Sequence, residues 1–336
     1  MRILVLGGTV FLGRAVARLA RAAGHDVTCA ARGVSGRPVD GVRLVVVDRD
    51  DPAGLSSLDG ERFDAVVDVT RRPSHARHAV DALADRVGHW TYVSTISVYA
   101  DQATPGGTPA STPLLAPAPP EVDDPSGPNG HWYGACKVAC ELAVRDRIAA
   151  DRLFICRAGL LIGPEDPSDR FPYWVARLAA GGEVLAPGAP DEPVQLVHVA
   201  DLAGWLLHAA GTGLAGCFDG IGPVTTRAEV LAAIAAGVGQ PQPRLTWVDG
   251  DFLREHDVRP WSGERALPLW LEPGYEGMLA RDVGAALAAG LTPRPVAEAA
   301  ADTRRWMLAE PAAVARGGLD RASEARVLRD WHHRGR

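Results

Sequence analysis

The first 160 residues alternate short apolar runs with segments whose apolar positions recur at helical spacing. Apolar runs separated by helices are typical of a parallel sheet covered on both faces. The first helix is expected over 14–23, and a short strand before a helix at 199–210 is expected to extend the sheet. The pattern therefore predicts an α/β fold, a doubly wound parallel sheet of the Rossmann type. The expected strands cover residues 2–6, 25–32, 42–48, 63–70, 89–99 and 152–163.

Two regions break this alternation. Residues 101–130 are rich in Pro, Gly, Ser and Thr, so a long loop without regular structure is expected there, either mobile or functional. After about Phe218 the chain continues in shorter helical pieces, which indicate a smaller C-terminal lobe. Most of its tryptophans are expected in a core, with one or two lining a pocket: Trp247, Trp261, Trp270, Trp306 and Trp331.

A glycine-rich turn joins the first strand to the first helix. In LVLGGTVFLGR it places Gly7, Gly8 and Gly13 where backbone N–H groups at a helix start can face a pyrophosphate. The alternative is a plain turn whose glycines only reverse the chain. The position directly after a buried strand favours dinucleotide binding. The expected contacts from this turn are Gly7, Thr9, Val10, Phe11, Leu12 and Gly13.

The end of the second strand discriminates between the two dinucleotides. An acidic residue there would bind the ribose 2′-hydroxyl of NAD, whereas an arginine accommodates the 2′-phosphate of NADP. The strand ends in Ala31 and Arg32, with no acid. NADP is therefore the preferred cofactor and NAD the alternative, and a merely solvated arginine is the competing explanation. Asp48 is a candidate partner for the adenine amino group, and Arg49, Val69 and Thr70 complete the expected cofactor contacts.

The segment HWYGACKVACE contains the only lysine of a chain with 35 Lys plus Arg. Tyr133 and Lys137 are spaced i, i+4 on an expected helix, so their side chains share a face. A nearby ammonium favours phenolate and lowers a tyrosine pKa from about 10, and its donors can hold ribose hydroxyls. The competing explanation is a surface pair between Lys137 and Glu141, one turn further on. Thr95 or Ser94, after the fifth strand, would supply a hydroxyl to a substrate oxygen.

Together these motifs resemble the extended short-chain dehydrogenase/reductase superfamily, in its epimerase/dehydratase-like branch. The resemblance implies that Tyr133 is the acid/base, that Lys137 is its partner and a ribose ligand, and that Thr95 is the third catalytic member. It also places Ser97 and Leu160 toward the substrate. The matching segments are GGTVFLG (7–13), STISVYA (94–100), YGACK (133–137), RAGLLIGP (157–164) and HVADLAGW (198–205), in the order and spacing of that family.

Three positions depart from the family pattern. Val10 replaces the middle glycine of G-x-x-G-x-x-G, which alters the approach to the phosphates without removing Gly7 and Gly13. Leu160 stands where the family members that act on nucleotide sugars carry an asparagine. Residues 95–97 read Thr-Ile-Ser, where sugar dehydratases carry Thr-Asp-Glu. The departures favour a less polar substrate than a nucleotide sugar.

Composition limits the other classes of function. A net charge of −6 and a pI near 5.9 argue against a nucleic-acid-binding surface. No apolar run reaches the length of about 18 residues that a membrane span needs, and no export signal follows Met1, so the cytoplasm is expected. Five scattered cysteines do not indicate a disulfide framework. Cys136 and Cys140 share a helical face and are expected in the core rather than on a metal, and no metal is expected.

The leading hypothesis is an NADP-preferring oxidoreductase that reduces a carbonyl or imine of a small, specialised metabolite. The first alternative is a redox-neutral epimerase or dehydratase that retains NAD, because it would use the same tyrosine. The second is a dinucleotide-sensing binding protein, which the tyrosine–lysine pair disfavours. Homodimers are common in the family. The expected division is a dinucleotide-binding domain over 1–158 and about 191–217, a substrate lobe over about 159–190 and 218–310, and a C-terminal tail over 311–336. The basic end of this tail, 326–336, is expected to fray.

Overall fold

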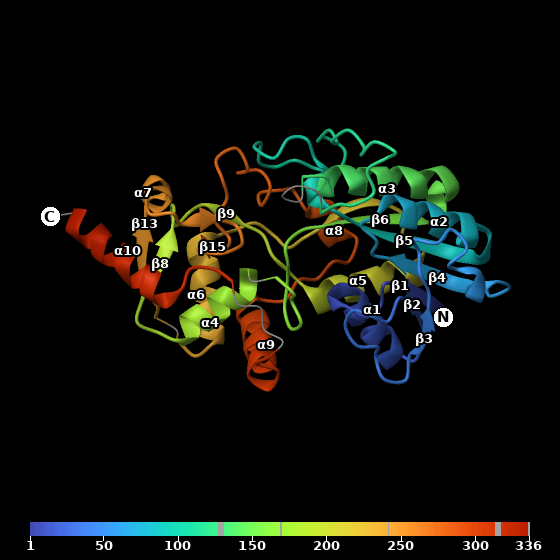
Figure 1. The fold of residues 1–336 in the computed structure, drawn as a ribbon, viewed down its shortest axis with the longest axis horizontal. Helices are drawn as coiled ribbons and strands as arrows, with labels where there is room; N and C mark the ends of the chain where they lie inside the picture. The colour runs from blue at the N-terminus through green and yellow to red at the C-terminus, as the bar shows by residue number, and fades with distance from the viewer. Residues whose placement is uncertain (127–130, 169, 241, 313–316, 335–336) are drawn as a thin grey trace.

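The computed structural model describes residues 1–126, 131–168, 170–240, 242–312 and 317–334. Its largest element is a seven-stranded sheet in the order β11-β6-β5-β4-β1-β2-β3, shown on the right of Figure 1. Every pairing within this sheet is parallel, which confirms the predicted Rossmann-type fold. The strands are β1 (Arg2–Leu6), β2 (Asp26–Ala31), β3 (Arg43–Val46), β4 (Phe63–Asp68), β5 (Val87–Thr95), β6 (Leu153–Ala158) and β11 (Gly216–Gly220).

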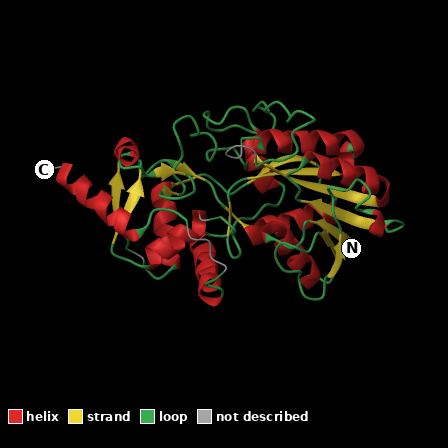
Figure 2. Ribbon diagram, viewed as in Figure 1, coloured by secondary structure: helices red, strands yellow, loops and turns green. Residues whose placement is uncertain are grey.

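Helices cover the sheet on both faces (Figure 2). Alternate residues of a strand point to opposite faces, so Ile3 and Val5 of β1 pack in one apolar cluster while Leu4 and Leu6 pack in another. The first cluster lies under α1 (Phe11–Ala22) and α5 (Val199–Thr212), and the second under α2 (Pro73–Leu83) and α3 (Tyr133–Arg147). Burial on both faces explains why the strands appear as continuous apolar runs in the sequence.

Three expected strands end or pair differently in the structure. The strand expected to extend the sheet, β10 (Val197–His198), pairs instead with β7 (Leu161–Ile162), and β11 forms the seventh strand. His198 is already the N-cap of α5, so β10 is too short to span the sheet. The fifth strand stops at Thr95, where the 3-10 helix η3 (Ile96–Val98) begins. The sixth splits into β6 and β7.

The C-terminal half is built on a separate apolar core with small two-stranded sheets (left of Figure 1). Two fully buried aromatic side chains of this core, Phe171 and Trp174, belong to α4. Its helices are α4 (Arg170–Ala179), α6 (Arg227–Gly237), α7 (Gly250–Glu255), α9 (Val296–Ala309) and α10 (Arg321–Arg334), while α8 (Gly284–Ala288) packs with the first half. Its strands are β8 (Glu183–Pro187), β9 (Pro193–Val194), β12 (Thr225–Thr226), β13 (Arg244–Val248), β14 (Arg259–Pro260) and β15 (Ala266–Leu267).

Two expectations for this half are wrong. Residues 326–334, expected to fray, form the second part of α10, whose Val327 and Leu328 are buried and whose Glu324 pairs with Arg177 at 2.7 Å. Of the five tryptophans expected mostly in a core, only Trp270 is buried, while Trp247, Trp261 and Trp331 are partly exposed at the edge of the core and Trp306 is also partly exposed. Among the described residues, no helix is long and apolar enough to cross a membrane.

Candidate active site

The glycine turn after β1 is packed too closely for larger residues at three positions. Gly7 has φ +98°, a conformation that favours glycine. A Cβ at Gly13 would lie 2.3 Å from the carbonyl oxygen of Gly7, and one at Gly8 would lie 2.2 Å from Sγ of Cys29. Val10 instead has an extended backbone with φ −133°, so this position does not require the glycine of the family pattern.

A cavity of about 410 Å³ opens beside this turn, at the carboxyl ends of β1, β2 and β4. This is where a doubly wound sheet binds its ligands, and the uncapped N-terminus of α1 offers free N–H groups there. The residues present therefore fit a dinucleotide. Seven of the expected cofactor contacts line the cavity: Gly7, Thr9, Val10, Arg32, Arg49, Val69 and Thr70.

The remaining expected cofactor contacts lie elsewhere. Asp48 is exposed and its Oδ1 accepts the N–H of Asp50 at 3.0 Å, while its neighbours on either side line the cavity. Successive side chains past the end of β3 point in alternate directions, so the Asp48 side chain points away from the cavity. Phe11, Leu12 and Gly13 form the start of α1, and the Leu12 side chain is buried in the core, which leaves only its backbone for a ligand.

Sequence reasoning missed a group of polar residues on the wall of this cavity. Arg72 pairs with Asp50 at 2.8 Å and, from its Nε, with Asp123 at 2.8 Å. Asp123 also accepts hydrogen bonds from the backbone N–H and the hydroxyl of Ser74. His75 contacts Asp50 at 2.8 Å. These contacts fasten the 101–126 segment beside the cavity, and Asp124, Pro125 and Ser126 line it.

Tyr133 and Thr95 meet where α3 begins and β5 ends. Thr95 caps η3 by accepting the N–H of Ser97 at 3.2 Å, and its hydroxyl is hydrogen-bonded with the Tyr133 side chain. Gly134 allows this approach, because a Cβ there would lie 2.2 Å from the carbonyl oxygen of Ser97. The structure thus brings Thr95, Ser97 and Tyr133 together, as the sequence pattern predicts for the hydroxyl-bearing part of the site.

The electrostatic environment of Tyr133 differs from the expected one. Burial raises the pKa of Tyr133 above its ordinary value, and this outweighs the hydrogen bond from Thr95 and the positive charges of Arg71 and Arg170, which lower it. The expectation of a pKa lowered by Lys137 is therefore wrong in direction. The phenol keeps its proton near neutral pH, as a proton donor must. Arg71 directly follows the expected contact Thr70, whereas Arg170 lies in a part of the chain without a recognisable motif.

Lys137 is held inside the protein by backbone oxygens. Its Nζ donates to the carbonyl of Thr70 at 2.6 Å and to that of Val93 at 2.5 Å, and only 2% of the residue is exposed. Burial lowers the pKa of Lys137 to about 8. The competing surface pair with Glu141 is ruled out, because Glu141 is 1% exposed and pairs with Arg157 at 2.7 Å.

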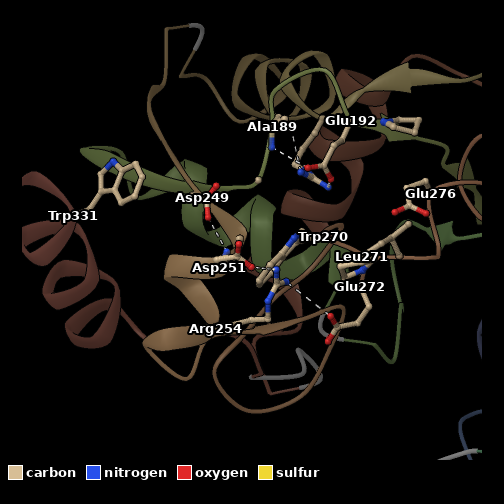
Figure 3. A pocket seen from close by; sticks show the side chains of 15 residues that line it. Ala189, Glu192, Asp249, Asp251, Arg254, Trp270, Leu271, Glu272, Glu276 and Trp331 are labelled. Atoms are coloured by element: carbon tan, nitrogen blue, oxygen red, sulfur yellow. Dashed lines mark hydrogen bonds and ion pairs between the residues drawn. The ribbon is translucent and has the colours of Figure 1, made fainter. Parts of the chain in front are cut away.

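The other expected substrate contact, Leu160, is packed in the apolar core. It is 4% exposed and lies in the cluster that contains Ile96 and Val138, next to the end of β5. A second cavity of about 590 Å³ lies in the C-terminal half, near α7 and α10 and away from α3 (Figures 1 and 3). Trp270 and Trp331 line it, so the expectation that one or two tryptophans border a pocket is confirmed.

Comparison with known proteins identifies the family and the fold. Residues 3–217 match the NAD dependent epimerase/dehydratase family. The chain is 26% identical over 314 residues to the epimerase family protein SDR39U1 of Bos taurus, covering 85% of this chain and 98% of that protein. It is 28% identical over 271 residues to the 3-diazoavenalumate denitrifying reductase of a Streptomyces species, covering 73% and 84%. The UDP-N-acetylglucosamine 4-epimerase structure from Bacillus cereus shares the fold with a TM-score of 0.65 at 18% identity, over 92% and 99% of the two chains.

Proposed function

The chain belongs to the NAD dependent epimerase/dehydratase family, and from this premise we propose that it is an NAD(P)-dependent reductase of a carbonyl or imine. The observation that carries the proposal is the protonated Tyr133, hydrogen-bonded with Thr95 at the end of β5. A proton donor in this position serves a reaction in which a substrate oxygen or nitrogen gains a proton. The substrate is a small metabolite, and specialised metabolism is its proposed setting.

The side chains have separate roles in this reaction. A bound nicotinamide dinucleotide supplies the hydride and is itself oxidised. Tyr133 gives its hydroxyl proton to the substrate oxygen or nitrogen as the carbon receives the hydride, so that one electron pair and one proton are added. Thr95 holds the same substrate atom through its hydroxyl. Lys137 holds the carbonyls of Thr70, which lines the cavity, and of Val93, and its remaining N–H donor is assigned to the ribose.

NADP is the preferred form of the cofactor in this proposal. Arg32 follows β2 directly and lines the cavity together with Gly33, Val34 and Ser35. A guanidinium and a hydroxyl at this place suit a 2′-phosphate, whereas no carboxylate ends β2 to receive the two ribose hydroxyls of NAD. The positive charge of Arg32 contributes to lowering the pKa of Asp50. This carboxylate therefore offsets part of the positive charge that Arg32 would offer to a 2′-phosphate. Selectivity for NADP should therefore be moderate.

A redox-neutral epimerase is the second candidate, and the family membership favours it as well. Such an enzyme would oxidise its substrate and reduce it again on the same retained NAD, with Tyr133 acting first as base and then as acid. The raised pKa of Tyr133 is less suited to the first of these steps, because a phenol that holds its proton is a poor base. The streptomycete relative is also named a reductase. A dinucleotide sensor is a third candidate, and it would not need this tyrosine.

The nucleotide content of the purified protein tests the proposal first. Protein denatured immediately after purification is analysed for released nucleotide by mass spectrometry, and emptied protein is titrated with NADPH and NADH. A reductase releases little nucleotide and binds NADPH reversibly and more tightly than NADH. Stoichiometric NAD that stays bound through purification would instead identify the redox-neutral epimerase.

Replacement of the tyrosine separates an enzyme from a sensor. With a carbonyl or imine compound that the wild type reduces, Tyr133→Phe should lower kcat by about 10²- to 10⁴-fold while NADPH still binds. Tyr275→Phe is the matched control, because Tyr275 is exposed in the C-terminal half and should leave turnover unchanged. Unchanged turnover in Tyr133→Phe would remove the catalytic assignment.

A further inference from the structure

The cofactor cavity concentrates positive charge in a chain whose net charge is −6. Its lining residues include four arginines and a single carboxylate, that of Asp124. A surface of this kind favours the phosphate groups of a ligand. The arginines follow β2 and β3 and lie in the segment between β4 and α2: Arg32, Arg49, Arg71 and Arg72.

Two of these arginines already have a defined partner or place. Arg49 pairs at 3.0 Å with Asp68, whose side chain is fully buried. Arg71 directly follows Thr70, whose carbonyl oxygen accepts the hydrogen bond from Lys137, so it lies toward the catalytic side of the cavity. The two arginines next considered for a ligand phosphate at the β2 side are therefore Arg32 and Arg72.

The turn over residues 47–50, after β3, lies between the end of β2 and α2. The N–H of Val47 donates to the carbonyl oxygen of Ala31 at 3.1 Å, so Arg32 follows directly beside this turn. On the other side, Nδ1 of His78 in α2 lies 2.9 Å from the carbonyl oxygen of Arg49. The backbone thus brings the β2 end, the turn and α2 together along one wall of the cavity.

Asp50 ends this turn and contacts two residues of the cavity wall. Its Oδ1 lies 2.8 Å from a guanidinium nitrogen of Arg72 and 2.8 Å from Nε2 of His75, and both partners line the cavity. A carboxylate accepts hydrogen bonds and donates none, so Nε2 of His75 carries a proton. The Asp50 side chain is 43% exposed, which leaves it able to move. One carboxylate of the protein thus takes up donors that face a cavity suited to phosphates.

We infer that Arg72 binds the 2′-phosphate of NADP together with Arg32, and that Asp50 competes with this phosphate and so limits the preference for NADP over NAD. The phosphate carries a charge of about −1.5 to −2 near neutral pH, more than the single charge of a carboxylate, and guanidiniums bind its oxygens well. The neutral 2′-hydroxyl of NAD gains nothing comparable by displacing Asp50. This inference rests on the proposed function and names residues that select its cofactor.

Arg72 has a second anchor that keeps it in place when Asp50 is displaced. Its Nε donates to Asp123 at 2.8 Å, and Asp123 is itself held by the backbone N–H and the hydroxyl of Ser74. The nitrogen that contacts Asp50 is a different one, Nη1. The guanidinium can therefore exchange one carboxylate for a phosphate without losing its orientation.

The test uses two nucleotides that differ only in the 2′-phosphate. Adenosine 2′,5′-bisphosphate and 5′-AMP are titrated by calorimetry into emptied wild type, Asp50→Asn and Arg72→Gln. Asp50→Asn keeps an acceptor oxygen and removes the charge, so we expect it to bind the bisphosphate about 3- to 10-fold more tightly. Arg72→Gln should bind the bisphosphate about 10-fold more weakly. The affinity for 5′-AMP should stay within about 2-fold in both variants, which a general structural disturbance would not allow.

Asp51→Asn is the matched control, because it removes the same charge one residue further on. Asp51 is exposed and its Oδ1 accepts the N–H of Ala53 at 2.9 Å, so the ratio of the two affinities should not change. In the double variant of Asp50→Asn and Arg72→Gln, the gain from Asp50→Asn should shrink, since the two residues act on the same phosphate.

Three results would each overturn the inference: an unchanged ratio in Asp50→Asn, an equal gain in Asp51→Asn, or a parallel loss for both nucleotides in Arg72→Gln. Turnover that still depends on Tyr133 would in that case leave the proposed reductase function standing. A wild type that binds neither nucleotide up to about 10 mM and neither NADPH nor NADH would overturn both.

Discussion

The sheet-bearing half of the molecule leaves more helix starts without a side-chain cap than the C-terminal half, where α9 is the described example. In the first half, α1, α2 and α3 begin without a side-chain cap, and the hydrogen bonds of the buried Lys137 go to the carbonyl oxygens of Thr70 and Val93. In the second half, α6 has a complete capping box from Thr226 and Glu229, and α7 is capped by Asp249. Its buried arginines are paired with carboxylates, as Arg177 is with Glu324.

The difference shows where the protein has capacity for ligands. Open N–H groups at the start of α1 border the cavity at the carboxyl ends of the strands, and the buried ammonium of Lys137 is linked to it through the carbonyl of Thr70, which lines that cavity. Each half also has exceptions, of which one in each half is considered next. Glu141 and Arg157 form a fully paired ion pair in the first half, and α9 begins without a side-chain cap in the second. The first of these supports the β5–α3 junction, because Glu141 of α3 accepts the hydroxyl of Ser94 of β5.

The largest effect is expected from breaking the buried ion pair between Glu141 and Arg157. Glu141→Leu would leave Arg157 buried without its carboxylate and remove the acceptor of the Ser94 hydroxyl. Loss of one partner of a buried pair costs about 3–5 kcal/mol in the free energy of unfolding. Urea denaturation monitored by circular dichroism measures this difference. Glu61→Leu, which breaks a solvent-accessible pair with Arg43, should cost about 1 kcal/mol or less; equal losses in the two variants would contradict the assignment of Glu141 as a buried support.

A smaller effect is expected from the titration of Lys137. Its pKa is lowered to about 8 in the folded protein from 10.5, so the unfolded chain binds more protons between these values. Stability therefore rises as the pH increases through this window, by an amount on the order of 2 kcal/mol. The measurement is the free energy of unfolding of wild type relative to Lys137→Met at several pH values from 7.5 to 10.5. A difference between the two proteins that does not change with pH would show that Lys137 titrates normally when folded.

A local effect is expected at the segment beside the cofactor cavity. Asp123→Ala removes the acceptor for the Ser74 backbone N–H, the Ser74 hydroxyl and the Arg72 guanidinium. These bonds are partly exposed, so we expect a loss of about 1–2 kcal/mol that is confined to this segment. Hydrogen exchange of peptides from 101–126 should accelerate while exchange in β5 stays unchanged. Acceleration throughout the sheet would indicate a global role instead, and Asp124→Ala is the neighbouring control.

The sequence predicted the sheet well because its strands are buried on both faces. Side chains such as Ile3 and Leu4 are fully buried on opposite sides of β1, and this produces continuous apolar runs. The same reasoning extended the third strand past Val46, where apolar residues continue but pairing stops. The helix α10 was missed because its stability depends on a distant partner: Glu324 is buried against Arg177, and nothing within 321–334 signals that contact.

Only the part of the site that lies in recognisable motifs could be predicted from the sequence. Thr95 and Tyr133 belong to motifs whose spacing follows from the strand–helix order, so their meeting at the β5–α3 junction could be expected. The pKa direction of Tyr133 could not, because burial outweighs neighbouring charges and no local pattern reports burial. Asp50 and Arg72 come from separate segments that only the packing of α2 beside the end of β3 brings together. Contacts of this kind require the structure.

The smallest expected effect concerns the helix ends with which the two halves were compared. Val10 is the N-cap of α1 and makes no side-chain hydrogen bond, so Val10→Asn should raise the free energy of unfolding by about 0.5–1 kcal/mol without nucleotide. The new amide would occupy an N–H group that otherwise faces the cavity, and affinity for NADPH should fall. Thr226→Ala, at the capping box of α6, should lower stability by about 1 kcal/mol and leave NADPH affinity unchanged. Thermal unfolding with and without NADPH measures both quantities. If Val10→Asn raised stability without weakening NADPH binding, the open start of α1 would not be reserved for the cofactor.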